Sequence, residues 1–282
     1  MELTTEQYDQ LIDQALDEDL GTGDITTDAL IESSQRGSAS IRAKSSGVLA
    51  GVEVAKQVLL RVDPGLKVNI LIGDGSPLKA GDVIARVDGK IASMLKAERT
   101  ALNFLQHLSG IATETARYVE AVRGLNARIA DTRKTIPGLR MLEKYAVLMG
   151  GGKNHRMRLD DGILIKDNHL KALGRQGLSM KQIITQARAK NARGLKIEVE
   201  VKSPDEAMEA ALAKADIIML DNMSIEDMEK TVQLIRGRSL IEASGGVHLD
   251  NVRAIAETGV DIISVGALTH SARALDINMK LD

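Results

Sequence analysis

The chain has 282 residues, a formal net charge of −2 and 44% hydrophobic residues, enough for one large domain or two of ordinary size. Its three Tyr, one Phe and absence of Trp leave few platforms for stacking single-stranded nucleic acid, and a pI near 6.3 argues against binding duplexes. The absence of cysteine excludes disulfides and thiolate metal sites. With neither a signal-peptide core nor a membrane-spanning apolar run, we expect a cytoplasmic protein that binds neither nucleic acid nor membranes.

The first part of the chain predicts a small domain of helices and strands. Thr4 or Thr5 is a suitable cap for a first helix, which the glycine-containing turn DLGTGDITT ends. Between residues 38 and 87, alternating apolar and polar residues predict strands separated by tight turns. Residues 90–124 are expected to be helical, as two helices broken near Ser109-Gly110.

After residue 124, apolar strands alternate with amphipathic helices, which predicts a parallel sheet covered by helices. The candidate strands are Ala127–Thr132, Gly162–Lys166, Leu195–Val201, Asp216–Leu220, Leu240–Ala243 and Asp261–Val265. The helices between them are Pro137–Met149, Ser179–Ala189, Pro204–Ala213, Ile225–Leu234 and Leu249–Glu257. This count favours a closed or nearly closed α/β barrel over a doubly wound sheet, and no GxGxxG motif follows the first strand.

Chemically useful residues follow or end every candidate strand, and in an α/β barrel the C-terminal strand ends carry the chemistry. In chain order they are Arg133 and Lys134, Lys166, Glu200, Asp221, Ser244-Gly245-Gly246, and Gly266. Each has a structural alternative: a solvated strand end for Arg133-Lys134, an ion pair for Lys166, an Asx turn for Asp221 and simple strand termination for the glycines. Their coincidence at one rim favours a site.

The segment from Asp131 to His169 concentrates positive charge on turns. Its cations are Arg133, Lys134, Lys153, His155, Arg156, Arg158 and Lys166. In a slightly acidic chain, this clustering predicts a site for a small, highly anionic ligand. The glycine turns after the last two strands leave backbone N–H groups room to bind a phosphate, and His270 lies four residues beyond Gly266.

Carboxylates of the barrel strands suggest a metal. Glu198 and Glu200 face the same side of one strand, where carboxylates need a charged partner or a metal. Glu200 and Asp221 are hard oxygen ligands that suit Mg²⁺ held jointly with phosphates. Zinc has little support, because the chain has no cysteine and no HExxH spacing around its histidines. The residues thus predict a phosphorylated, multiply anionic substrate without identifying it.

From about residue 18 to the C-terminus, the chain resembles the quinolinate phosphoribosyltransferase family. The segments that carry the resemblance are EDLGTGDITT, ERTALNFLQHLSGIAT, DTRKTIPGLR, EKYAVLMGGGKNHR, LIKDNH, IEVEV, LDN, EASGG and SVGALTH. The RKT, GGGxNHR and IKDNH segments are highly specific in combination. Ile136 departs from the family, which often has threonine there, but the change removes no charge.

The resemblance implies a reaction and an architecture. The family transfers the phosphoribosyl group of phosphoribosyl pyrophosphate to the nitrogen of quinolinate with loss of the C2 carboxylate. The products are nicotinate mononucleotide, pyrophosphate and CO₂, for de novo NAD synthesis. An N-terminal α+β sandwich domain is expected at 1–110, an incomplete, open parallel α/β barrel at 111–270, and a C-terminal segment at 271–282 packed on the N-terminal domain. Homodimers, or a hexamer of dimers, with shared active sites are also implied.

The resemblance also implies residue roles, carried over motif by motif. The carboxylates of quinolinate are expected to contact Arg133, His155 and Arg156, with Arg99 reaching the site from the partner chain. Lys134 is expected between the two substrates and Lys166 facing them, while Glu200 and Asp221 bind Mg²⁺ or the ribose hydroxyls. The residues expected to hold the 5′-phosphate are Ser244, Gly245, Gly246, Gly266 and His270.

Three other interpretations compete with this one. A pyrophosphorylase-like protein associated with molybdenum transport shares much of the motif set and has a different acceptor substrate. Lys166 in a phosphate-binding barrel also fits a Schiff-base aldolase. A non-catalytic protein could use the cationic cluster to bind nucleotides or other polyanions.

Overall fold

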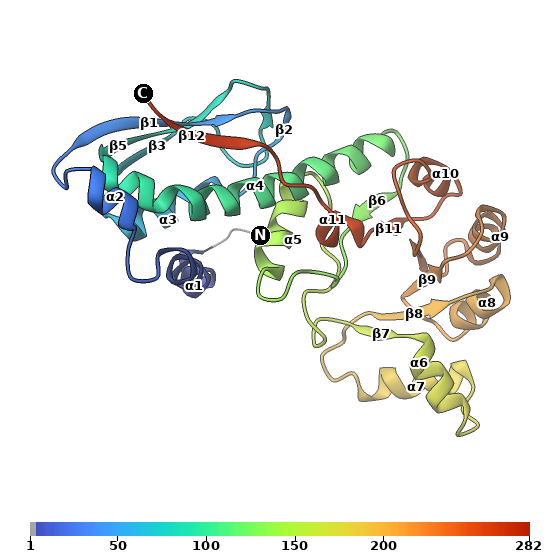
Figure 1. Cartoon of the computed structure of the whole chain (residues 1–282). Coiled ribbons are helices and arrows are strands. Elements are labelled where there is room, and N and C mark those ends of the chain that lie inside the picture. Colours follow the sequence, from blue (N-terminus) through green and yellow to red (C-terminus); the bar gives the residue numbers. More distant parts are fainter. Residues whose placement is uncertain (1–3) are drawn as a thin grey trace. The chain divides into compact units, whose positions relative to one another are not determined.

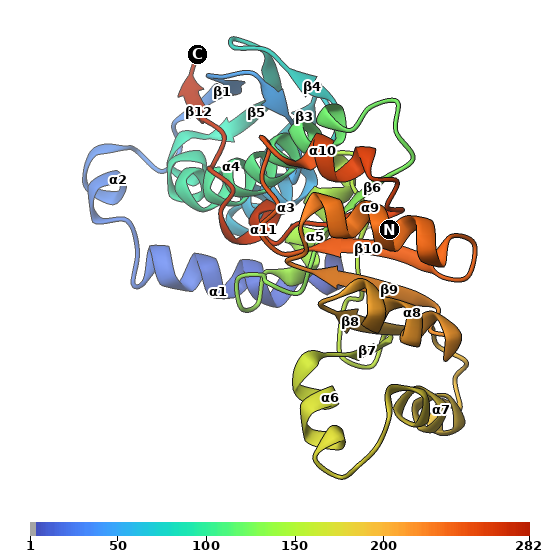
Figure 2. The same cartoon turned by 90° about the vertical axis from the view of Figure 1, so that its right-hand side faces the viewer.

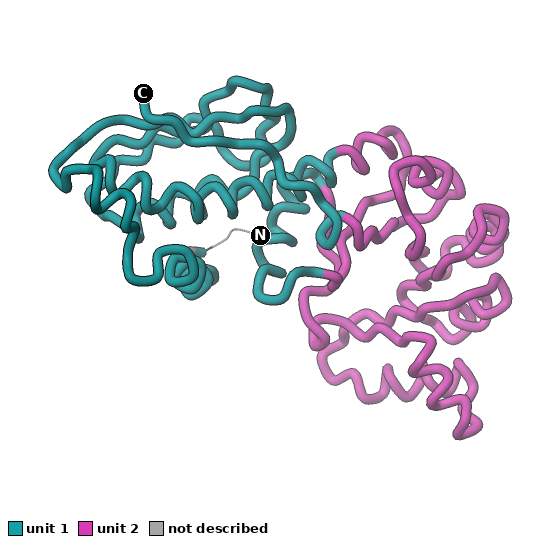
Figure 3. The backbone as a smooth tube through the Cα atoms, viewed as in Figure 1, with its two compact units in different colours: residues 1–116, 135–151, 268–282 teal, residues 117–134, 152–267 magenta. Residues whose placement is uncertain are grey.

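The computed structural model describes residues 4–282, which form two compact units (Figures 1 and 3). Unit 1 comprises the chain up to residue 116 together with residues 135–151 and 268–282, and unit 2 comprises residues 117–134 and 152–267. Each unit therefore contains segments that are distant in sequence. The expected domain limits at residues 110 and 270 stay a prediction. Within residues 4–282, none of the helices combines the length and apolar composition that a membrane crossing requires.

Unit 1 is built on a four-stranded antiparallel sheet in the order β12-β1-β5-β3. Its strands are β12 (Ile277–Leu281), β1 (Arg36–Ala43), β5 (Val83–Lys90) and β3 (Lys67–Ile70). Helices α3 (Val52–Val62) and α4 (Ile91–Ala121) lie on one side of this sheet (Figure 1). The other elements of unit 1 are η1 (Thr5–Gln7), α1 (Asp9–Leu20), α2 (Ile25–Leu30), the β2-β4 pair (Gly47–Val48 and Pro77–Leu78) and α5 (Arg140–Met149).

Two local expectations for unit 1 are wrong. Helix α1 begins at Asp9, after the η1 turn, and its N-cap residue is Tyr8 rather than Thr4 or Thr5. Helix α3 lies inside residues 38–87, where only strands were expected. Its buried apolar residues recur at helical spacing, from Val54 and Ala55 to Val58 and Leu59, so burial against the sheet decides in favour of a helix.

The expected break in the long helix is also wrong, since α4 runs through Ser109-Gly110 as one helix of 31 residues. A Cβ at Gly110 would lie 2.2 Å from the carbonyl oxygen of Arg273. Glycine is therefore needed there for close packing of the C-terminal segment, not for a bend. The Ser109 hydroxyl accepts a hydrogen bond of 3.0 Å from the Ala50 amide, which holds the same turn of the helix against the segment before α3.

Unit 2 is a six-stranded parallel sheet in the order β6-β11-β10-β9-β8-β7, with helices on its outer side (Figures 1 and 2). The strands are β6 (Arg128–Ala130), β7 (Ile163–Ile165), β8 (Ile197–Val201), β9 (Ile217–Asp221), β10 (Leu240–Ser244) and β11 (Ile262–Ser264). The helices are α6 (Asp167–Gly174), α7 (Met180–Lys190), α8 (Pro204–Leu212), α9 (Ile225–Ile235) and α10 (Val252–Glu257). The short helix α11 (Ala267–His270) follows β11.

The barrel of unit 2 is open, because its edge strands β6 and β7 are not paired with each other in the described part of the chain. This confirms the predicted incomplete α/β barrel with a smaller α+β domain. Serine side chains define where three outer helices begin: Ser179, Ser203 and Ser224 each accept a hydrogen bond from a backbone amide in the first turn of α7, α8 and α9. The caps Ser203 and Ser224 lie in the short turns that connect β8 to α8 and β9 to α9.

Candidate functional site

The strand register brings the predicted carboxylates to one face of the sheet. Glu200 on β8 pairs with Met219 on β9, and Met219 pairs with Glu242 on β10. Two residues further towards the C-terminal ends, and so on the same face, Asp221 pairs with Ser244. Because successive side chains of a strand alternate between faces, Glu198 shares the face of Glu200, as predicted.

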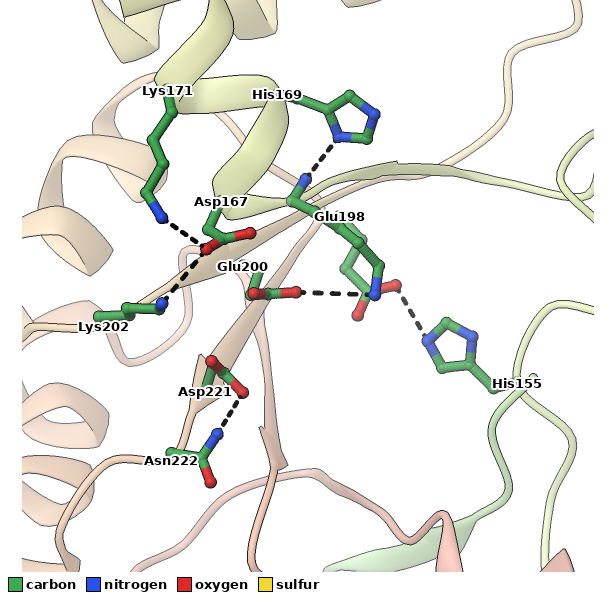
Figure 4. A network of polar contacts seen from close by, with 10 residues as sticks. His155, Asp167, His169, Lys171, Glu198, Glu200, Lys202, Asp221 and Asn222 are labelled. Atoms are coloured by element: carbon green, nitrogen blue, oxygen red, sulfur yellow. Dashed lines mark hydrogen bonds and ion pairs between the residues drawn. The ribbon is translucent and has the colours of Figure 1, made fainter. Parts of the chain in front are cut away.

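Glu200 and Asp221 form a carboxylate pair at the C-terminal ends of adjacent strands (Figure 4). Burial raises the pKa of Glu200, and the charge of Asp221 raises it further, whereas Lys166 opposes the shift. The Lys166 Nζ lies 3.8 Å from Glu200 Oε2, and only 12% of the Glu200 side chain is exposed. Two neighbouring carboxylates repel each other because both are negatively charged. A hard divalent cation bound between them relieves that repulsion.

Asn222 and Gly245 pack tightly beside Asp221. The Asn222 side-chain amide donates a hydrogen bond of 2.8 Å to Asp221 Oδ1, and its backbone amide donates one of 2.9 Å to the Ser244 carbonyl. A Cβ at Gly245, whose φ is +87°, would lie 2.5 Å from the Asn222 side chain. Gly246 also has a positive φ, of +63°, and its carbonyl accepts a hydrogen bond from Asn251. The glycine loop after β10 is therefore a tight turn that packs directly against the Asn222 side chain.

Arg133 and Arg156 approach each other although 22 residues separate them. The link is a short parallel extension of β6, in which the Lys153 amide donates to the Ile129 carbonyl and the Asp131 amide donates to the Lys153 carbonyl. The buried Asp131 carboxylate then accepts a hydrogen bond of 2.8 Å from the His155 amide. Sequence reasoning missed this role of Asp131, for which a carboxylate at the end of a buried strand was the available signal.

The positive charge of Arg133 affects the pKa of Arg156. Burial lowers the pKa of Arg156, and the positive charge of Arg133 lowers it further, while Glu198 opposes both. Arg156 Nη1 also donates a hydrogen bond of 3.0 Å to the Gly162 carbonyl, which fixes its direction. Two guanidinium groups held in mutual repulsion form a place where an anionic ligand is favoured.

His155 lies against two buried carboxylates in the barrel interior. Its Nε2 is 3.1 Å from Glu198 Oε2 and 3.6 Å from Glu242 Oε2, a cluster with the composition of a metal site. However, Nδ1 accepts a hydrogen bond of 2.9 Å from the Arg156 amide, which places the proton of a neutral imidazole on Nε2. In this arrangement Nε2 donates to Glu198 and has no lone pair for a metal, so His155 positions the Arg156 backbone.

Glu242 is a further site residue that the sequence reasoning missed. Burial raises its pKa to about 7, the charge of Glu198 adds to this, and His155 and Ser264 oppose it. The available signal was its position between Ile241 and Ala243, because a carboxylate in a buried strand has to be paired, protonated or bound to a ligand.

The remaining predicted residues divide between the two units. In unit 2, Lys134 is exposed and its amide donates to Thr132 Oγ1 at 3.0 Å, while the half-buried Gly266 follows β11. Arg99 on α4 and His270 on α11 belong to unit 1, and both are exposed. The Nδ1 of His270 lies 2.6 Å from the Ser271 hydroxyl. Their roles as a contact from the partner chain and as a phosphate ligand stay predictions.

Comparisons with known proteins agree over nearly the whole chain. A family model described as "Quinolinate phosphoribosyl transferase, N-terminal domain" matches residues 24–109, and one for the C-terminal domain matches residues 111–280. Probable nicotinate-nucleotide pyrophosphorylases [carboxylating] of Synechocystis sp. and Bacillus subtilis are 43% and 42% identical, covering 97% of this chain and 92% and 93% of theirs. The crystal structure of NadC from Streptococcus pyogenes is 45% identical, with a TM-score of 0.95 over 99% of this chain and 98% of that chain.

Proposed function

The chain belongs to the quinolinate phosphoribosyltransferase family, and we propose from this premise that it makes nicotinate mononucleotide in de novo NAD synthesis. It is a pentosyltransferase that moves the phosphoribosyl group of phosphoribosyl pyrophosphate to the nitrogen of quinolinate and releases pyrophosphate and CO₂. The alternative acceptor of a molybdenum-associated homologue is not favoured, because the curated relatives are named carboxylating pyrophosphorylases or decarboxylating transferases.

One observation carries the proposal: unit 2 holds a pair of mutually repelling arginines and a pair of mutually repelling carboxylates on the same barrel. Quinolinate has two adjacent carboxylates, which suit the forked guanidinium groups of Arg133 and Arg156. Phosphoribosyl pyrophosphate suits the carboxylate pair of Glu200 and Asp221, because its diphosphate binds together with a divalent cation. The direct contact of His155 with quinolinate stays a prediction, and its Nδ1 supports the grip by accepting a hydrogen bond from the Arg156 amide.

Transfer of the phosphoribosyl group breaks the bond between ribose C1 and the pyrophosphate oxygen and forms a bond from C1 to the quinolinate nitrogen. Positive charge develops at C1 as the bond breaks, and Glu200 and Asp221 stabilise it electrostatically. Lys134 and Lys166 are proposed to face the departing diphosphate. The Lys166 ammonium group, 3.8 Å from Glu200, balances the carboxylate charge before substrates bind. Catalysis then rests on positioning and electrostatics, without a covalent nucleophile.

We propose Mg²⁺ as the cofactor, with Glu200 and Asp221 binding either the ion or the ribose hydroxyls. When bound, Mg²⁺ supplies charge neutralisation for the diphosphate leaving group. The fixed turn at Ser244, Gly245 and Gly246 supports a role in holding the 5′-phosphate, with Gly266 and His270 as further contacts. Glycine turns leave backbone N–H groups accessible to a phosphate.

The finer features of the family are also carried to this chain as proposals. The active enzyme is a homodimer, or a hexamer of dimers, in which Arg99 of one protomer completes the site of the other. Loss of the C2 carboxylate leaves an electron pair on the ring carbon next to the newly cationic nitrogen, and that carbon then takes up a proton. We place the enzyme in the cytoplasm.

A turnover assay tests the function directly. Purified protein given quinolinate, phosphoribosyl pyrophosphate and Mg²⁺ is expected to release CO₂ and pyrophosphate in equal amounts and to form nicotinate mononucleotide. Nicotinate in place of quinolinate should give no product, and removal of divalent cations with a chelator should stop turnover until Mg²⁺ is restored. The absence of nicotinate mononucleotide from quinolinate would overturn the assignment. Product from nicotinate without CO₂ would indicate a plain nicotinate transferase.

A further inference from the structure

Unit 2 contains a cavity of about 970 Å³ that lies away from Glu200 and Asp221 at the C-terminal strand ends. Arg128, Leu240, Ile217 and Ile262 are the first residues of β6, β10, β9 and β11, so the cavity opens at the N-terminal strand ends. In α/β barrels this end ordinarily serves stability and the opposite end carries catalysis. A hollow of this size, within the range of pockets that hold small ligands, is therefore unexpected there.

Unsatisfied carboxylate oxygens line the inner part of the cavity. Both oxygens of Glu242 and Oε1 of Glu198 are buried, and among the residues that the structure describes only the Ser264 hydroxyl lies near Glu242 as a donor. Glu242 is 1% exposed. His155 donates its one Nε2 proton to the other Glu198 oxygen, so it leaves these acceptors unsatisfied. Buried acceptors without donors are rare in folded proteins, so these oxygens are suited to a bound molecule that brings hydrogen-bond donors.

The walls and the mouth have a different character from the inner end. Ile217, Leu240 and Ile262 provide apolar walls, and Leu240 is 40% exposed, unusually high for a large apolar strand residue. Arg128 and Lys196 at the mouth are exposed, and neither forms an ion pair within residues 4–282. Lys153 adds a third exposed cation to the lining.

The acidic residues near the mouth do not neutralise these cations by direct pairing. Asp161 Oδ2 accepts a hydrogen bond of 2.9 Å from the Met157 amide. Asp261 Oδ2 accepts one of 2.8 Å from the Ile241 amide. The cations are therefore available to an anion that approaches from solvent.

We propose that this cavity is a second ligand site, which binds a mononucleotide: a phosphate monoester of a nucleoside whose flat ring carries an N–H donor. The phosphate is bound by Arg128, Lys153 and Lys196, since guanidinium and ammonium groups pair strongly with phosphate oxygens. The ring lies between the apolar strand residues. Its N–H group donates to the oxygens of Glu242 and Glu198.

Occupancy of this cavity affects the catalytic side if the proposed function holds. His155 and Arg156 line the cavity, and the proposed function assigns Arg156 to the carboxylates of quinolinate. A nucleotide that donates a hydrogen bond to Glu198 Oε1 binds the same carboxylate that His155 contacts through Oε2 and, through His155, acts on the position of the Arg156 amide. Such regulation is expected to change the KM for quinolinate and to leave the KM for phosphoribosyl pyrophosphate constant.

The test uses AMP as the probe, titrated calorimetrically into the full-length protein at low salt with Mg²⁺ and saturating phosphoribosyl pyrophosphate, which occupies the proposed catalytic site. We expect saturable binding of AMP, with adenosine and ribose 5-phosphate each at least about tenfold weaker because each lacks one half of the recognition. The double substitution Arg128→Gln/Lys196→Gln should reduce AMP affinity to that of adenosine. The control Lys230→Gln, at an exposed lysine on α9, should not change it.

Two results would overturn the second site: no saturable AMP binding at millimolar concentration, or wild-type AMP affinity in the double variant. An equal loss in Lys230→Gln would reduce the effect to long-range charge and would also reject it. The two proposals fail separately, because AMP binding is measured without turnover. A protein that converts quinolinate but binds no AMP rejects only the cavity, and the reverse result rejects only the proposed function.

Discussion

Gly245→Ala is the substitution that most directly tests the glycine loop after β10. The backbone there has a φ of +87°, and the added Cβ would lie 2.5 Å from the Asn222 side chain. A non-glycine residue in the left-handed region costs about 1–2 kcal/mol of stability. The clash has a second effect, because Asn222 has to move and its hydrogen bond of 2.8 Å to Asp221 is lost.

The magnitude of that second effect follows from the bond that is broken. A hydrogen bond to a charged group contributes about 1.5–3 kcal/mol, so misplacing Asp221 should lower kcat/KM for phosphoribosyl pyrophosphate roughly ten- to a hundredfold. The KM for quinolinate should change little, because the arginines that bind it lie on other strands and loops. Initial rates of pyrophosphate release, with each substrate varied in turn, measure both constants.

Gly237→Ala provides a matched control for backbone strain. Gly237 has a φ of +76°, yet no atom lies within 4 Å of the position that its Cβ would take. Both variants should lose thermal stability through backbone strain, Gly245→Ala the more because of its clash with Asn222, and only Gly245→Ala should lose activity towards phosphoribosyl pyrophosphate. Equal kinetic effects in the two variants, or a wild-type kcat/KM for phosphoribosyl pyrophosphate in Gly245→Ala, would refute the packing explanation.

Three further predictions concern charge and assembly. Burial raises the pKa of Glu242 to about 7 from an ordinary 4.5, so the proton that favours the folded state is lost as pH rises through about 7. Glu242→Gln should therefore match the wild-type free energy of unfolding near pH 4.5 and exceed it at about pH 8, by at most about 3 kcal/mol; an unchanged difference between the two proteins across this pH range would contradict this. Arg133→Ala and Arg156→Ala should raise the KM for quinolinate at least about tenfold and that for phosphoribosyl pyrophosphate less, with the exposed Arg158→Ala as an unaffected control. Equal increases for both substrates would argue against the carboxylate roles. Arg99→Ala should be inactive alone and regain activity when mixed with an inactive barrel variant; no recovery would count against a shared site.

Local sequence patterns were sufficient for the barrel strands and for the residues at their ends. All six candidate strands overlap observed ones, because a strand covered by helices needs an apolar run whatever surrounds it. Period-two alternation also placed Glu198 and Glu200 on the same face. The family resemblance then connected Arg133, His155 and Arg156, which pattern reasoning alone had only grouped as cations.

Local patterns failed where a residue's role depends on a distant neighbour. Gly110 does not break α4, since its missing side chain admits the Arg273 carbonyl. The role of Asp131 is visible only in the folded chain, where its carboxylate accepts a hydrogen bond from the His155 amide. These contacts join residues that are far apart in sequence, and no periodicity within one segment encodes them.

The sequence by itself therefore determined the family, the parallel strands and the inventory of cations, carboxylates and glycines, because each depends on local residue types and their order. Only the tertiary structure decided which of these groups lie together and in what environment. It placed Glu200 beside Asp221, the proton of His155 on Nε2, and Glu242 buried at the inner end of a cavity. The physical reason is that charge repulsion, burial and hydrogen-bond direction act through space. They are fixed only when strand register and loop packing bring distant segments together.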